Sequence, residues 1–139
     1  MKVAINKCYG GFGLSMEGWL YYAKLKGITL YPVTDKRGND GSLNFNKFEY
    51  VKEGDRPFLV HYLTKPLLDD GSYAKDSYFS TDDIERTDPF LIQTIEELGA
   101  KADGSCAELE IVEIPNDISW HIEEYDGIEW IAEDHRTWE

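Results

Sequence analysis

The sequence of 139 residues has few cysteines, few basic residues and no long apolar run. Its two cysteines, Cys8 and Cys106, are too few to staple a small secreted fold, and no Cys/His pattern has zinc-site spacing. No stretch approaches the roughly 18 consecutive apolar residues of a membrane-spanning helix, and the first residues lack the apolar segment of a signal peptide. The sequence therefore predicts a cytoplasmic protein without a membrane partner. Its length suits a single domain over residues 1–139.

Basic residues are scarce. The chain has 27 Asp and Glu against 14 Lys and Arg, a formal net charge of −13. From residue 108 onward, eleven acidic residues accompany a single basic residue, Arg136. Nucleic-acid-binding proteins take much of their affinity from basic side chains on phosphates, so we expect no direct DNA or RNA binding. A strongly acidic surface either maintains solubility or steers a basic partner toward itself, and composition leaves both explanations open.

Local signals predict two helices. Ser15 is a suitable N-cap and Gly27 a suitable C-terminal stop, which predicts a helix over about 15–26. The second helix, over about 89–98, begins with the N-cap Asp88 and with Pro89 at the first helical position. Gly99 follows its last turn.

The remaining patterns predict strands. Asp126-Gly127 between alternating segments indicates a C-terminal β-hairpin with a type I′ turn, and Pro32 favours an edge position for the second strand. The order of elements predicts an α+β fold, a single domain with a mostly antiparallel sheet, two helices and that hairpin. Residues 35–80 fit no clear pattern and are expected to form a variable or partly mobile insertion.

Three segments resemble one known family. The start INKCYGGFGLS (5–15), the segment DPFLIQTIEELG (88–99) with the following IVEIP (111–115), and the end EEYDGIEWIAEDHRTW (123–138) resemble a family of small uncharacterised proteins of tailed phages and prophages. The resemblance covers about half the chain, at both ends. It implies a phage origin and the host-cell cytoplasm as the setting. The family has no established activity, so the resemblance assigns no catalytic residue.

The glycine-rich loop after the first strand is one candidate site. Its residues are Lys7, Gly10, Gly11, Gly13 and Ser15. Backbone N–H groups of such a loop before a helix can bind an anion, so a nucleotide or signal molecule is a candidate ligand. The loop lacks the lysine of a P-loop and the spacing of a dinucleotide-binding motif. A structural turn is the competing interpretation.

Catalytic and metal sites have weaker support. Cys8 with one of the histidines would make a nucleophile only if the two lie together, and free cysteines are more often buried core residues, which is what we expect of Cys8 and Cys106. His121 and Glu123 share a strand face as metal ligands do, but two ligands are a weak signal. We therefore assign no catalytic residue, no metal site and no cofactor, and whether the chain is an enzyme stays open, with a non-catalytic role favoured.

The hairpin is the second candidate site. The two-residue turn places Glu124 opposite Glu129, which destabilises a hairpin modestly. A protein tolerates such a pair where a partner uses the negative field or where a cation neutralises it. We predict a protein interface that consists of Glu123, Glu124, Asp126, Glu129, Glu133 and Trp138.

Two functions remain. The favoured one is a small acidic phage accessory protein that binds a host or defence protein with a basic surface, including a nucleic-acid-binding protein, through the acidic C-terminal region. The alternative is a binder of a nucleotide-like small molecule, or an enzyme acting on one, that uses the glycine loop.

Overall fold

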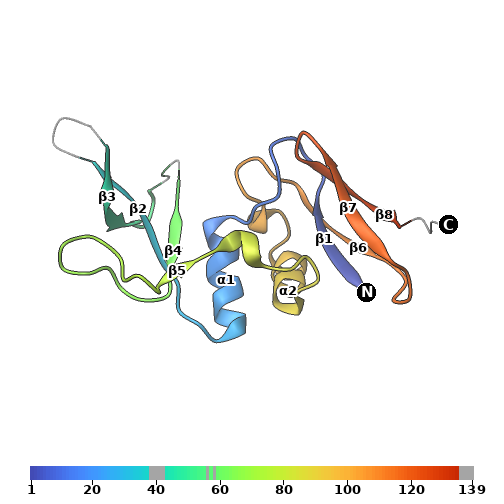
Figure 1. The fold of residues 1–139 in the computed structure, drawn as a ribbon, viewed down its shortest axis with the longest axis horizontal. Helices are drawn as coiled ribbons and strands as arrows, with labels where there is room; N and C mark the ends of the chain where they lie inside the picture. The colour runs from blue at the N-terminus through green and yellow to red at the C-terminus, as the bar shows by residue number, and fades with distance from the viewer. Residues whose placement is uncertain (38–42, 56, 58, 135–139) are drawn as a thin grey trace, which may run out of the picture. The chain divides into compact units, whose positions relative to one another are not determined.

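The computed structural model describes residues 1–37, 43–55, 57 and 59–134. Contacts divide the chain into two compact units: Met1–Tyr22 with Ile84–Glu139, and Ala23–Asp83. The two helices, the antiparallel strand pairings and the C-terminal hairpin confirm the predicted α+β class (Figure 1). No helix in the described ranges has the length and apolar character needed to cross a membrane.

The first unit contains two small antiparallel sheets. Strand β1 (Lys2–Asn6) pairs with β6 (Leu109–Glu113), and β7 (Trp120–Tyr125) pairs with β8 (Ile128–Glu133). Strand β1 is the most buried of the four, with only its first residue exposed. The buried apolar side chains of this unit come from β1, the two helices and the adjoining loops: Val3, Ala4, Ile5, Leu14, Trp19, Tyr22, Leu91, Ile92, Ile95 and Ala102.

Helix α1 (Met16–Lys26) has the predicted start and end. The Ser15 hydroxyl accepts a hydrogen bond from the backbone N–H of Gly18, as an N-cap does. At the other end Gly27 has a φ of 79°, and the N–H of Ile28 donates to the carbonyl of Ala23. This is the Schellman arrangement, which satisfies carbonyls that the last turn leaves free.

Helix α2 (Pro89–Leu98) is also as predicted, and the short 3₁₀ turn η2 (Gly99–Ala102) follows it. The Asp88 carboxylate caps the helix by accepting from the N–H groups of Phe90 and Leu91. It also accepts from the Tyr22 hydroxyl at 2.8 Å. Burial, together with this hydrogen bond, raises the pKa of Tyr22 well above its ordinary value. The cap therefore joins the two helices within the first unit.

The second unit is built on a four-stranded antiparallel sheet in the order β3-β2-β4-β5. Its strands are β2 (Tyr31–Arg37), β3 (Leu43–Tyr50), β4 (His61–Leu63) and β5 (Tyr78–Phe79), and the 3₁₀ turn η1 (Thr81–Asp83) ends the unit. The edge position predicted from Pro32 is wrong, because β2 is a central strand. Pro32 is tolerated near the start of β2, since the pairing with β3 begins only at Val33.

Residues 35–80, which the sequence sets apart, lie within this second unit. Part of the segment forms regular structure: the end of β2, then β3, β4 and β5. The register of the β2–β3 pairing shifts between Asp35 and Lys36, which marks a β-bulge or a similar irregularity. The expectation of sequence variability stays a prediction.

Candidate functional site

The C-terminal hairpin has the register that its turn predicts. Asp126 and Gly127 have φ values of 50° and 90°, as a type I′ turn requires, and Glu124 pairs with Glu129 across the strands. Side chains alternate between the two faces of the hairpin. One face carries His121, Glu123, Tyr125 and Trp130, all of them exposed, and these four residues are called the outer face below.

A hydrogen-bonded cluster covers much of the outer face. Glu123 accepts from Trp130 Nε1 at 3.0 Å, and its other carboxylate oxygen lies 3.0 Å from His121 Nε2. His121 Nδ1 contacts the carboxylate of Asp134, which also accepts from the Ser119 hydroxyl at 2.6 Å. Two hydrogen bonds raise the pKa of His121 above its ordinary value: the one to Glu123 has the larger effect and the one to Asp134 the smaller. The formal charges of His121, Glu123 and Asp134 sum to −1 when His121 is protonated and to −2 when it is neutral.

Two large aromatic side chains remain accessible beside these carboxylates. Tyr125 is 72% exposed and Trp130 is 39% exposed. No Lys or Arg occurs in the sequence between residues 102 and 134. The outer face therefore combines accessible aromatic area with negative charge.

Glu129 has a different role from the one predicted. It is 8% exposed, and its carboxylate binds the Arg86 guanidinium through two hydrogen bonds of 2.6 and 2.9 Å. It also accepts from the backbone N–H of Asn6 at 2.9 Å. A cation therefore neutralises the opposed Glu124–Glu129 pair, one of the two explanations that the sequence leaves open. The Glu129 carboxylate faces the interior and is not available to a partner at the surface.

Sequence reasoning missed Arg86. Its guanidinium lies 3.6 Å from the centre of the Phe12 ring and donates to the Ala4 carbonyl at 3.3 Å, besides binding Glu129. It therefore connects β1, β8 and the glycine loop. No local pattern marks Arg86 in the sequence, since Glu129, its ionic partner, is 43 residues away.

The other predicted interface residues are not part of the outer face. Glu124 and Glu133 alternate onto the opposite face of the hairpin and are exposed, and Asp126 is exposed in the turn. The Glu124 carboxylate accepts from the Gly127 N–H at 2.9 Å. Trp138 lies outside the described residues.

The glycine loop has the contacts of a packed turn. The Gly10 N–H donates to the Asp126 carbonyl at 3.2 Å, and a Cβ at Gly127 would collide with the backbone nitrogens of Gly10 and Gly11. The Ser15 hydroxyl donates to the Lys101 carbonyl at 2.6 Å while it caps α1. These glycines allow close backbone approach, and several polar groups that an anion would need are already hydrogen-bonded. Lys7 is exposed, and a ligand at Gly13 or elsewhere on this loop stays a prediction.

The prediction that Cys8 and Cys106 are both buried is wrong. Cys106 is exposed in a turn, and Cys8 is partly exposed just after the end of β1. Strand β6 begins only at Leu109, because residues 104–107 form a turn in which the N–H of Ala107 donates to the carbonyl of Gly104 at 3.1 Å. No group of three or more His, Cys, Asp or Glu that could hold a metal ion occurs in the part of the chain that the structure describes.

The two units differ in formal charge. The first unit contains 17 acidic and five basic residues, a net charge of −12, whereas the second has ten and nine, a net charge of −1. The hairpin thus belongs to the unit that carries nearly all of the negative charge. Comparison of the chain with protein-family models, curated proteins and solved structures finds no match.

Proposed function

We propose that this chain is a non-catalytic binding protein that docks on a basic protein surface through the outer face of its C-terminal hairpin. The observation that carries the proposal is the exposure of Tyr125 and Trp130 beside Glu123 on one face of the strongly acidic unit. Because the Glu129 carboxylate is buried against Arg86, the proposed interface excludes Glu129, which the sequence had placed among the interface residues.

The two kinds of side chain have separate roles in docking. Tyr and Trp are enriched among the residues that dominate binding energy, since they bury large areas and lose little conformational freedom. Carboxylates around them accelerate encounter with a positive surface and make association sensitive to salt. Glu123 also holds the Trp130 ring through its hydrogen bond, so part of the surface is ordered before a partner arrives.

The resemblance of both chain ends to tailed-phage proteins supports a host-cell cytoplasmic setting. The proposed partner is therefore a host or defence protein with a basic surface. Proteins that bind nucleic acid have such surfaces, and an acidic docking face would compete with nucleic acid for them.

Two charge-matched variants test the proposal. The hairpin variant replaces Glu123 by Gln and the exposed Asp126 and Asp134 by Asn, because these acids lie on the outer face or at its ends. The control variant replaces three exposed acids elsewhere in the first unit by Gln: Glu97, Glu110 and Glu113. Both lose three negative charges. Each variant and the wild-type chain are immobilised on separate supports and incubated with a bacterial lysate at low and at moderate ionic strength. The captured proteins are quantified by mass spectrometry.

We expect the wild-type and control chains to capture the same basic protein, and the hairpin variant to capture at least several-fold less of it. Its remaining binding is expected to depend less on salt. Equal capture and equal salt dependence for the two variants would contradict the proposal. Far-ultraviolet circular dichroism verifies that both variants remain folded.

A further inference from the structure

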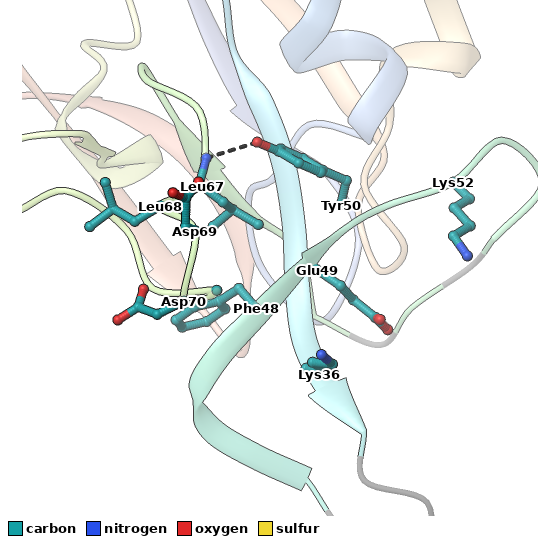
Figure 2. Close-up of a pocket in the computed structure, with 10 residues that line it drawn as sticks. Lys36, Phe48, Glu49, Tyr50, Lys52, Leu67, Leu68, Asp69 and Asp70 are labelled. Carbon is teal, nitrogen blue, oxygen red and sulfur yellow. Dashed lines mark hydrogen bonds between the residues drawn. The ribbon is translucent and has the colours of Figure 1, made fainter.

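A cavity in the second unit does not form one binding site. It has a volume of about 440 Å³ and lies beside the edge strand β3, where the loop 67–71 faces that strand (Figure 2). Strand alternation places Glu49 on the face of β3 opposite Phe48. Lys36 and Lys52 lie across β3 from the Phe48 ring, as Figure 2 shows. The charged and the aromatic groups of this lining therefore face different sides of the strand.

The sheet of β1 and β6 has a more definite binding surface, its open edge. In an antiparallel pair, residues that exchange main-chain bonds alternate with residues whose N–H and C=O groups point outward. The Ile114 N–H donates to the Met1 carbonyl at 2.8 Å, just beyond one end of the pairing. The Lys7 N–H donates to the Glu108 carbonyl at 2.8 Å, just beyond the other end. The even-numbered residues of β6 are therefore bonded to β1, and its outward-pointing residues are the odd-numbered ones: Leu109, Ile111 and Glu113.

On β1, the fold itself covers the outward donors. The Ala4 N–H donates to the Arg86 carbonyl at 2.8 Å. The Asn6 N–H donates to the Glu129 carboxylate at 2.9 Å. Both donors belong to even-numbered residues of β1, whose register partners on β6 are odd-numbered, so these bonds confirm the alternation.

On β6, the outward edge is largely open. Its first outward N–H, that of Leu109, donates to the Asp103 carboxylate at 3.0 Å. In the part of the chain that the structure describes, the outward N–H and C=O groups of Ile111 and Glu113 have no hydrogen-bond partner. Glu113 is exposed and Ile111 is half-buried. Two donors and two acceptors therefore lie along this edge at the spacing of an extended chain.

The side chains of β6 narrow the kind of partner. The strand contains no proline and no bulge interrupts its register with β1, although both devices commonly protect an exposed edge. Its exposed Glu110 and Glu113 disfavour an acidic strand beside them. The net charge of −12 on the first unit also disfavours a second copy of this chain. The half-buried Ile111 offers apolar contact to a β-branched side chain.

We propose that the open edge of β6 binds an extended, non-acidic segment of another protein as an added β-strand. Main-chain bonds to Ile111 and Glu113 hold the segment, and a β-branched side chain of the segment packs beside Ile111. Because recognition is by main-chain groups, the Glu-to-Gln changes of the control variant above leave this edge in place. The edge is distinct from the outer face of the hairpin, so the proposal survives if docking through that face is disproved.

The test uses a synthetic peptide, acetyl-Lys-Thr-Val-Thr-Val-Thr-Lys-amide, and NMR spectra of the full chain. The control peptide has the same sequence and charge, but its three central residues are N-methylated, so neither of its edges can pair fully. We expect the first peptide alone to shift the Ile111 and Glu113 amide signals saturably and to slow their hydrogen exchange about tenfold. No shift at millimolar concentration, equal shifts from both peptides, or shifts confined to the hairpin would overturn the proposal.

A variant then isolates one main-chain donor. Ile111→Pro removes an N–H that points away from β1 and leaves the β1–β6 bonds in place, as an edge position allows. We expect it to weaken the peptide about tenfold, the effect of losing about one hydrogen bond. The matched control Ile111→Val keeps the N–H and is expected to bind the peptide as the wild-type chain does. Equal binding by the two variants would contradict strand addition.

Hydrogen exchange of the free chain provides a measurement that needs no variant. The amides of Ile111 and Glu113 are expected to exchange about tenfold or more faster than those of Glu110 and Val112, which are bonded to β1. Equal protection of the four amides would show that the edge is already covered and would refute the proposal.

Discussion

The buried Arg86–Glu129 pair predicts which glutamate of the hairpin the fold depends on. The Glu129 side chain is 10% exposed and that of Arg86 is 25% exposed, with N–O distances of 2.6 and 2.9 Å. The substitution Glu129→Gln leaves one oxygen to accept hydrogen bonds and leaves Arg86 without its counter-charge. Removing one partner of a buried ion pair costs about 3–5 kcal/mol. Because a quarter of the Arg86 side chain reaches water, we expect about 3 kcal/mol of lost stability, the lower end of that range.

Glu124 provides a matched control on the other strand. It is the cross-strand partner of Glu129, and Glu124→Gln removes the same single charge. Its side chain is exposed, and an amide oxygen still accepts the hydrogen bond from Gly127. We expect a change within about 0.5 kcal/mol, with any gain arising from relief of like-charge repulsion.

Urea unfolding followed by tryptophan fluorescence measures both variants. All four tryptophans of the chain belong to the first unit, so this signal reports the unit that contains the ion pair. The difference in free energy follows from the shift in midpoint at constant slope. Equal midpoints for the two variants would refute the argument that burial and Arg86 distinguish Glu129 from Glu124.

Three further predictions concern the same unit. The pKa of His121, followed by NMR, is expected above 6.5 and to fall in the variant E123Q. Because the pKa of His121 is higher in the folded state than in the unfolded state, its protonation stabilises the fold fully at pH values below the pKa of the unfolded state. This stabilisation is lost as the pH rises through the pKa of the folded state. A His121 pKa at its ordinary value would contradict this prediction. Gly127→Ala is expected to cost about 2–4 kcal/mol more than Gly54→Ala in chemical denaturation, because both have positive φ but only Gly127 meets backbone atoms; equal costs would contradict the close approach. The exposed Cys106 thiol is expected to react with a maleimide in native conditions, and labelling only after unfolding would show that it is covered.

Most elements with local signals were predictable. The ends of α2 follow from Asp88, Pro89 and Gly99, and the hairpin register follows from Asp126-Gly127, because each determinant lies within a few residues of the structure it specifies. The position of β2 was not predictable in this way. Pro32 disfavours a central strand because it has no backbone N–H to donate to a neighbouring strand. The missing N–H is tolerated here because the pairing of β2 with β3 starts only after Pro32, and the sequence does not show where that pairing starts.

The candidate sites also have some features that the sequence predicts and others that only the fold determines. The sequence by itself determined the acidic character of the C-terminal region, the opposed glutamates and the glycine loop, since composition and short-range register are properties of the chain. Tertiary structure decided that Glu129 is neutralised by Arg86, that the glycine loop packs on the hairpin turn, and that β3 and the loop 67–71 line a cavity. Each of these depends on residues distant in the chain approaching within a few ångströms. Burial and charge neutralisation are set by such contacts, and no pattern along the chain encodes them.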